Sequence, residues 1–246
     1  MKVIAVAIQK GGTGKTTTAA ALAWAGSAKG LRVLAIDLDP QKNLSYTLGA
    51  TATGGGAYSL ITGQPPESLI QATEQGPDVI PATADLSTIT TGRGSARRLQ
   101  QALDPIRDQY DLIIIDTPPT AGELQYNALQ AADGLIIPLE AFDYDYQSLH
   151  QITDTARQIM QTNPALTIIG CVITRYDGRA TINRQTRDII RAEADKIGVP
   201  YLGTIRQGVA IREAVRLQKP LFKYARRSNV AQDYMELFDT ITAQEV

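Results

Sequence analysis

The sequence predicts an α/β fold, with a doubly wound, mostly parallel sheet and helices on both of its faces. Three observations lead to this prediction. Short runs of apolar, mostly β-branched residues recur along the chain, as in strands buried on both faces. Segments with helical spacing separate most of these runs, which is the order that parallel strands require. Gly, Asp and Thr residues follow several runs, and the carboxyl edge of such a sheet is where ligands bind.

Length and composition indicate an ordinary globular chain. Its 246 residues, 43% hydrophobic and 20% charged, can bury a large core, and we expect a single domain over residues 1–246. Cys171 is the only cysteine and His150 the only histidine, which excludes an intrachain disulfide and a Cys/His zinc site. No apolar run approaches the roughly 20 residues that cross a bilayer. The first run is also too short for a secretory signal, so we expect a cytoplasmic protein.

The first apolar run, residues 3–8, leads through a glycine-rich loop into the Ala-rich residues 17–28, which have high helix propensity. This is the context of a phosphate-binding loop, in which backbone N–H groups and a helix N-terminus surround an anion. We expect Lys15 to contact the β- and γ-phosphates and the Thr16 hydroxyl to bind Mg²⁺. The predicted nucleotide-binding residues of the loop are Lys10, Gly11, Gly12, Thr13, Gly14, Lys15, Thr16 and Thr17.

The loop departs from the general pattern G-x-x-x-x-G-K-[ST], because Gln9 stands at its first position. It also contains a second lysine, Lys10. Most lysines are solvated surface charges. A cation inside a loop that wraps a triphosphate would, however, interact strongly with it. Taken alone, these residues predict a nucleoside triphosphatase.

The second run, residues 31–36, ends in two carboxylates, Asp37 and Asp39. Because they follow a strand of the predicted sheet, we expect them at its ligand-binding edge. One of them could hold the water shell of Mg²⁺ while the other orients the attacking water. A solvated acidic turn would explain the pair in isolation, but it is a weaker explanation after a phosphate-binding loop.

Residues 49–109 carry weaker signals. Gly54, Gly55 and Gly56 indicate a flexible loop, since no strong strand precedes them. A short helix is expected near residues 67–73 and a strand over residues 78–80. A helix over residues 95–109 would place Leu99, Leu103 and Ile106 on one face.

Residues 110–116 form the next strand pattern, and its final residue, Asp116, has the Walker B position. We expect Asp116 in the Mg²⁺ shell, together with Thr16 and Asp37. Further strands are predicted over residues 133–139, 166–173 and 201–205, and helices over residues 144–161, 181–197 and 229–243.

Three segments, KGGTGKTT at residues 10–17, DLDPQ at 37–41 and DTPP at 116–119, resemble the deviant Walker A ATPases, which are P-loop NTPases. Within that group the chain is most similar to the ParA/Soj partition ATPases of the MinD/ParA superfamily, over residues 3–241. The resemblance implies that Lys10 reaches the nucleotide of a second subunit, so that ATP joins two copies. It also implies catalytic roles for Lys10, Lys15 and Asp39, with Asp39 positioning water, and places Thr174 and Arg175 near the adenine. The chain resembles the small type, without a DNA-reading segment before the loop.

Charge is divided unevenly along the chain. Between Cys171 and Arg227 there are 13 Lys or Arg and 5 Asp or Glu, although the formal net charge of the whole chain is −1. Such asymmetry indicates a surface that faces a polyanion. A solvated charged face is the usual alternative, but cations without a base-reading motif suit sequence-independent contacts to duplex DNA. The predicted DNA-contacting residues are Arg184, Arg187, Arg212, Arg216 and Lys219.

The resemblance implies a cycle in which an ATP-bound sandwich dimer binds nucleoid DNA nonspecifically. A ParB-like centromere-binding protein then stimulates hydrolysis, and plasmid or chromosomal DNA is segregated. Two alternatives remain: a MinD-like switch on a membrane surface, and positioning of a protein cargo. A membrane switch needs a basic amphipathic C-terminal helix, whereas residues 233–246 contain several acids and neither Lys nor Arg. A related iron–sulfur carrier would need more than one cysteine.

Overall fold

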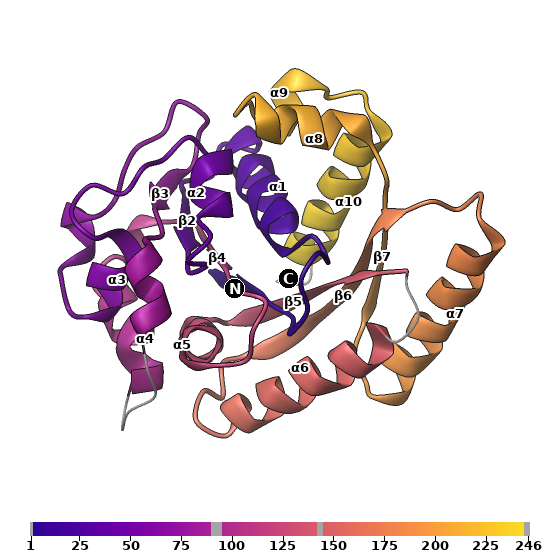
Figure 1. Ribbon diagram of the computed structural model, residues 1–246, viewed down its shortest axis with the longest axis horizontal. Helices are drawn as coiled ribbons and strands as arrows, with labels where there is room; N and C mark the ends of the chain where they lie inside the picture. Colours follow the sequence, from indigo (N-terminus) through magenta and orange to yellow (C-terminus); the bar gives the residue numbers. More distant parts are fainter. Residues whose placement is uncertain (1, 90–94, 142–144, 244–246) are drawn as a thin grey trace.

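A computed structural model of the chain describes residues 2–89, 95–141 and 145–243. Its strands form a seven-stranded sheet in the order β3-β2-β4-β1-β5-β6-β7 (Figure 1). All neighbouring strands in this sheet are parallel, and the order extends outward from β1 in both directions, which confirms the predicted doubly wound fold. The strands are β1 (Val3–Val6), β2 (Val33–Asp37), β3 (Asp78–Ile80), β4 (Leu112–Asp116), β5 (Gly134–Glu140), β6 (Thr167–Tyr176) and β7 (Tyr201–Arg206).

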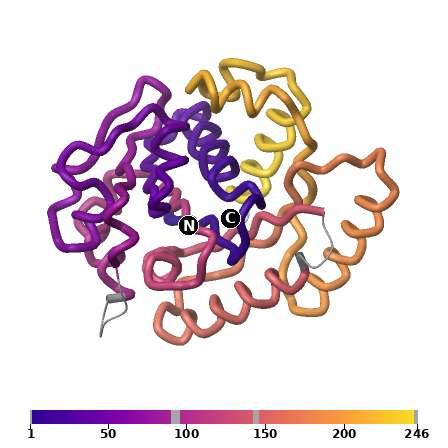
Figure 2. Tube along the Cα trace, in the orientation of Figure 1, coloured from indigo at the N-terminus to yellow at the C-terminus, as the bar shows by residue number. Residues whose placement is uncertain are grey.

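Helices cover both faces of the sheet, as the path of the chain in Figure 2 also shows. Alternate residues of each strand point to opposite faces, so Val3 and Ala5 belong to one buried cluster and Ile4 and Val6 to the other. The first cluster is covered by α3 (Gly56–Ile61), α4 (Arg98–Leu103), α5 (Glu123–Ala131), α6 (Asp145–Met160) and α7 (Thr181–Lys196). The second is covered by α1 (Lys15–Ala28), α2 (Asn43–Thr47), α8 (Val209–Arg216), α9 (Leu221–Tyr224) and α10 (Asn229–Ala243).

The helix predicted over residues 95–109 is interrupted. The structure has a 3₁₀ turn at Ser95–Arg97, then α4, and a second 3₁₀ turn at Arg107–Gln109. Pro105 explains the break, because proline lacks the N–H that continues a helix and clashes with the preceding turn. The predicted apolar face is nevertheless buried, since Leu99, Leu103 and Ile106 are at most 1% exposed.

Two predictions before β3 are also corrected. Residues 67–73 form no α-helix: a 3₁₀ turn at Pro66–Ser68 precedes an antiparallel bridge between Gln71 and Val79. The glycine run leads into α3, where a flexible loop was expected. Gly56 has a φ of 49°, and a Cβ there would lie 2.0 Å from the carbonyl oxygen of Pro81. Glycine is therefore required for the close approach of α3 to the chain after β3.

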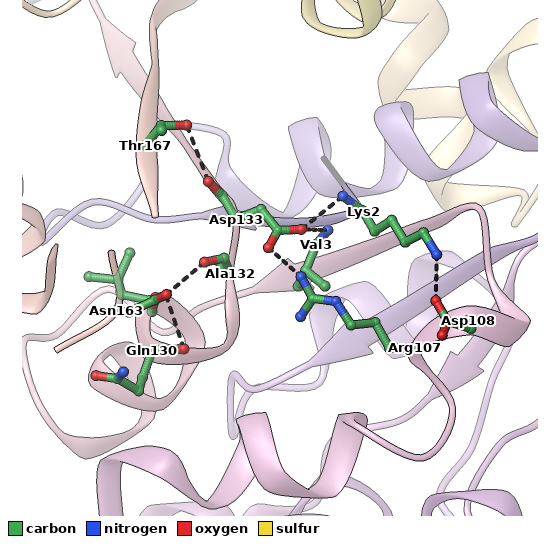
Figure 3. A network of polar contacts seen from close by, with 10 residues as sticks. Lys2, Val3, Arg107, Asp108, Gln130, Ala132, Asp133, Asn163 and Thr167 are labelled. Atoms are coloured by element: carbon green, nitrogen blue, oxygen red, sulfur yellow. Dashed lines mark hydrogen bonds and ion pairs between the residues drawn. The ribbon is translucent and has the colours of Figure 1, made fainter. Parts of the chain in front are cut away.

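Polar side chains close the amino edge of the sheet (Figure 3). Asp133 accepts hydrogen bonds from the backbone N–H groups of Lys2 and Val3 at 2.8 and 2.9 Å, and the Arg107 guanidinium contacts the same carboxylate. The Asn163 amide donates to the carbonyls of residues 129, 130 and 132, at the end of α5. These contacts satisfy backbone groups that burial would otherwise leave unpaired. The functional residues predicted from the sequence lie at the opposite, carboxyl edge.

Candidate nucleotide-binding site

The glycine-rich loop joins β1 to α1 at the carboxyl edge of the sheet (Figure 1). Gly12 and Gly14 both have a φ of 83°, a conformation that costs glycine little. Gly14 directly precedes α1, and a Cβ at Gly14 would lie 3.1 Å from the Thr174 hydroxyl. The loop therefore takes the tight, side-chain-free path that lets successive backbone N–H groups face an anion at a helix N-terminus.

Lys15 lies under this loop and is 6% exposed. Its ammonium group donates a 2.6 Å hydrogen bond to the carbonyl of Lys10, so the two lysines of the loop are directly connected. Burial lowers the pKa of Lys15, and the charges of Asp116 and Asp39 partly oppose this effect. A buried cation held this way can stabilise the charge of phosphate oxygens, since little water competes for it.

Three carboxylates gather beside Lys15. Asp37 and Asp116 end the neighbouring strands β2 and β4 in register, and both are fully buried. Burial raises the pKa of Asp37 to about 6, although hydrogen bonds from Ser45 and Asp39 oppose the shift. Burial also raises the pKa of Asp116, with the charge of Asp37 as the second cause.

Asp116 differs from Asp37 in its hydrogen bonds. Asp37 accepts from the backbone N–H of Asp39 and from both the N–H and hydroxyl of Ser45, at 2.7–3.0 Å. Asp116 accepts a 3.1 Å hydrogen bond from the Thr117 N–H, and the nearby Thr16 side chain opposes the rise of its pKa, but its Oδ2 is buried and has no partner among the described residues. An unpartnered carboxylate oxygen next to a threonine hydroxyl is a donor set that suits Mg²⁺. Among the described residues, no cluster of His, Cys, Asp and Glu could hold a metal on its own.

Asp39 is also buried, with 6% exposure. Its Oδ1 accepts a 2.9 Å hydrogen bond from the N–H of Gln41, and no described residue donates to Oδ2. Ser45 of α2 was not predicted as a site residue, although it fixes the Asp37 carboxylate. A serine eight residues after an aspartate gives no distinct sequence signal, because only the folding of the residues between them brings the two side chains together.

A cavity of about 410 Å³ opens next to the loop. Gly14, Thr17, Thr174 and Arg175 line it, as do residues from the β7–α8 connection and Tyr234 of α10. The Thr174 hydroxyl donates to the carbonyl of Thr13 at 2.9 Å, and Arg175 forms a 2.7 Å ion pair with Glu140. The structure thus brings the predicted residues Thr174 and Arg175 to the loop. A mostly apolar hollow of this size beside a phosphate-binding loop can hold a planar base.

The residues predicted to contact DNA lie on both sides of β7. Arg184 and Arg187 are on α7, whereas Arg212 and Arg216 are on α8, which covers the other face of the sheet (Figure 1). Lys219 follows in the turn after α8.

The two α7 arginines also have partners within the chain. Arg184 donates to the carbonyls of Gly178 and Arg179, at 2.7 and 3.1 Å. Arg187 lies over the ring of Tyr176, 5.8 Å from its centroid, and pairs with Asp188.

Fold and loop together define a P-loop nucleotide-binding protein. The family model AAA_31, described as an AAA domain, matches residues 1–168. The chromosome partitioning protein ParA of Caulobacter vibrioides is 37% identical over 257 residues, covering 100% of this chain and 95% of that protein. The chromosome-partitioning ATPase Soj of Thermus thermophilus is 36% identical, covering 98% of this chain and 95% of that protein. The chain therefore belongs to the ParA/Soj family of partition ATPases, within the MinD/ParA superfamily.

Solved structures with similar folds support this family assignment. Cobyrinic acid a,c-diamide synthase from Mycobacterium smegmatis, with a bound ATP analogue and magnesium, has a TM-score of 0.84 and 31% identity, covering 97% of this chain and 93% of that one. The cell division ATPase MinD of Pyrococcus furiosus has a TM-score of 0.81 and 25% identity, covering 99% of each chain. The protein is an ATPase, and its cofactors are ATP and Mg²⁺. Among the described residues, no helix is both long and apolar enough to cross a membrane.

Proposed function

We propose that this partition ATPase closes into a dimer when it binds ATP, and that the dimer binds duplex DNA without sequence preference. A ParB-like partner stimulates hydrolysis, and hydrolysis releases the dimer from DNA. The single observation that best supports the DNA-binding step is the group of exposed cations on α8 and the turn after it. Arg212, Arg216 and Lys219 are exposed there, and none has an ion-pair partner among the described residues. Cations of this kind supply the nonspecific, salt-dependent part of DNA affinity.

The proposed roles at the phosphate end follow from position and burial. Lys15 neutralises charge on the β- and γ-phosphates from beneath the loop, and backbone N–H groups of residues 11–16 bind the phosphate oxygens. Thr16 and Asp116 hold Mg²⁺, with Asp37 as a further member of its shell. When bound, Mg²⁺ neutralises the charge that develops on the phosphate oxygens.

Asp39 is proposed to orient the attacking water through Oδ2, while Gln41 fixes its other oxygen. Hydrolysis then depends on positioning and charge neutralisation, and no covalent enzyme intermediate is involved. Slow turnover without the ParB-like partner is expected, because positioning and charge neutralisation are the only contributions to catalysis.

DNA binding is tested by gel shift on random-sequence duplex with ATP, with ADP and without nucleotide. We expect retention with ATP, and a linear fall of log affinity with log salt. Arg216→Glu should weaken retention and reduce that slope by about two, because each copy in the dimer loses one phosphate contact. Arg98→Glu is the matched control, with the same charge change at an exposed position of α4. This helix lies in the connection from β3 to β4, whereas α7 and α8 flank β7 at the other end of the sheet, so retention should be unchanged. Equal retention by the parent in all three nucleotide states would contradict the proposal.

The membrane-switch alternative receives no support from α10. Its apolar residues Tyr234, Leu237, Phe238 and Ile241 are at most 4% exposed and pack in the same cluster as α1. An amphipathic helix whose apolar face is already buried cannot insert that face into a bilayer. Positioning of a protein cargo can be distinguished from DNA partition by the rate of ATP hydrolysis. In that case an adaptor of the cargo stimulates hydrolysis, and adding duplex DNA does not change the rate.

A further inference from the structure

The side chain of Gln9 ties the start of the loop to helices on the far face of the sheet. Its amide donates 3.1 Å hydrogen bonds to the side-chain oxygen of Gln125 and to the hydroxyl of Thr155. Gln125 lies on α5 and Thr155 on α6, which cover the first buried cluster, whereas α1 covers the second. The loop is therefore continuous with a helix on one face and hydrogen-bonded to two helices on the other.

Gln9 stands where the general phosphate-loop pattern has glycine. Glycine is required where φ is positive, and the φ of Gln9 is not positive. The backbone at this position therefore accepts a side chain, and this side chain reaches a fully buried partner, Gln125. The amide nitrogen of Gln125 has no partner among the described residues, so within them Gln9 alone holds the Gln125 side chain. A hydrogen bond in such a buried place meets little competition from water.

Two contacts orient the backbone of Lys10. On its N-terminal side, Gln9 is held by α5 and α6. On its C-terminal side, the carbonyl of Lys10 accepts the 2.6 Å hydrogen bond from the ammonium group of Lys15. The direction in which the Lys10 side chain leaves the backbone follows from the orientation that these contacts fix. A functional side chain is positioned accurately when neighbouring hydrogen bonds fix its surroundings in this way.

The Gln9 contact also connects the loop to the segment that follows Asp116. The Thr117 hydroxyl, at the start of this segment, donates to the carbonyl of Val6 at 2.9 Å. Gln125, in the first turns of α5, contacts Gln9 at the other end of the same segment. The start of the loop is thus held at two points by the chain that leaves β4.

We propose that Gln9 is a positioning residue, whose bonds to Gln125 and Thr155 aim Lys10 at the nucleotide of a second copy. The inference rests on the proposed dimer and names the residues within one copy that prepare it. Nucleotide binding to a single copy does not need this contact, because Lys15 and the backbone N–H groups of residues 11–16 supply it. Loss of the contact therefore weakens pairing of the copies and leaves nucleotide binding intact.

The physical basis is preorganisation. A lysine side chain loses conformational freedom when a ligand fixes it, and a loop start that moves freely adds backbone freedom to this loss. Holding the loop start in advance removes the backbone part from the free-energy cost of pairing. Each copy contributes one Lys10 to the proposed dimer, so a substitution of Gln9 acts twice.

The test is a double-mutant cycle with Gln9→Met, Gln125→Met and the double variant. Methionine keeps a similar length and removes the amide. The dissociation constant of the dimer is measured by sedimentation equilibrium with a saturating nonhydrolysable ATP analogue. We expect Gln9→Met to raise it about tenfold, since both copies lose the contact, and Gln125→Met about threefold, since the bond to Thr155 remains. The double variant should equal Gln9→Met, because Gln125 acts through Gln9.

Two further measurements separate positioning from a general loss of structure. Affinity for a fluorescent ATP analogue, measured at a protein concentration below that at which the parent pairs, should be the same in all variants. Melting temperatures show whether each variant is folded. If Gln9→Met does not fold, Thr155→Val removes one acceptor of the Gln9 amide and should raise the dissociation constant of the dimer about threefold.

Gln130→Met is the matched control. Gln130 also lies on α5, is 2% exposed, and exchanges hydrogen bonds with Thr162 at 2.9 and 3.2 Å. Its substitution removes an amide of the same kind from the same helix without touching the loop. We expect a lower melting temperature, as for Gln125→Met, with the dissociation constant of the parent dimer.

The outcomes separate the inference from the function on which it rests. If the parent pairs with the analogue and Gln9→Met pairs equally well, the Gln9 contact has no positioning role and the inference is wrong. It is also wrong if Gln130→Met weakens pairing as much as Gln125→Met, or if the effects of Gln9→Met and Gln125→Met simply add. If the parent itself does not pair with the analogue, the proposed function fails, and the inference fails with it.

Discussion

At the scale of single residues, the main feature of the site is an excess of buried carboxylates at the ends of β2 and β4. One cation, Lys15, is enclosed with Asp37, Asp39 and Asp116, all at most 6% exposed. Burying charges in excess of their partners costs free energy, and the raised pKa values of Asp37 and Asp116 are the consequence. A divalent cation would offset the excess negative charge, so the site is expected to be less stable without Mg²⁺ and nucleotide than with them.

Asp116→Asn tests this charge imbalance. The raised pKa of Asp116 means that the folded chain binds a proton more readily than the unfolded chain does. The contribution of Asp116 to the free energy of unfolding is therefore present at low pH, and it is lost as the pH rises through the pKa of the folded state. Replacing the carboxylate by an amide should raise the melting temperature of the protein without nucleotide and Mg²⁺ at the alkaline end of its stable range. Relief of one unsatisfied buried group, about 1–3 kcal/mol, corresponds to several degrees in a chain of this size.

The melting temperatures should converge as the pH falls, because the parent carboxyl then takes up its proton in the folded state. With Mg²⁺ and ADP the order should reverse, because the parent gains stability from ligand binding that the variant largely loses. Melting temperatures that differ equally at all pH values would contradict the charge explanation and point to a change in packing.

At the scale of elements, the sequence pattern predicts the strands and helices that are determined by their own residues. The strands and the long helices α1, α6, α7 and α10 lie within a few residues of the predicted ranges, since each combines apolar periodicity with sufficient length. The short helices α2 and α8 were not predicted, because distant contacts hold them. Ser45 of α2 bonds Asp37, and the Gln218 amide, just after α8, donates to the Tyr46 carbonyl at 2.6 Å.

The residues of the site also divide into those marked by local sequence and those brought together by distant contacts. The loop and the carboxylates could be predicted because a local motif and the ends of strands mark them. Among the residues that line the cavity beside the loop, Gly14, Thr17, Thr174 and Arg175 are predicted from the sequence to bind nucleotide, whereas its walls from β7, α8 and α10 could not be predicted. Sequence spacing likewise assigned Arg212 to a DNA surface, but could not indicate that it also lines the cavity. Contacts between segments that far apart carry no local signal.

Asn163→Ala tests how a single side chain holds an element. The Asn163 amide is buried and satisfies three carbonyls at the C-terminal end of α5 (Figure 3). Alanine would leave these carbonyls without a donor, which should destabilise the fold by about 2 kcal/mol and lower the melting temperature by about 4–8 °C. Asn43→Ala removes an exposed amide on α2 and is expected to have little effect on stability. Equal melting temperatures for both variants would show that the α5 end is held by other contacts.

The two edges of the sheet differ at the scale of the whole molecule. Side-chain networks close the amino edge (Figure 3), whereas the carboxyl edge carries the loop, the carboxylates and the cavity beside the loop. In the proposed dimer the carboxyl edges of two copies face one another, and Lys10 of each copy reaches the nucleotide of the other. DNA affinity then follows the nucleotide state, because pairing doubles the number of cations presented to one duplex.

The most direct test of this account is the mass of the protein in solution, measured by sedimentation velocity with a nonhydrolysable ATP analogue, for the parent, Lys10→Ala and Lys29→Ala. Lys29 is the control because it pairs with Asp239 at the far end of α1. We predict that the parent and Lys29→Ala sediment as dimers, and that Lys10→Ala remains a monomer while it still binds the analogue. A dimer of normal affinity in Lys10→Ala would contradict the central claim that this lysine joins two copies of the chain through ATP.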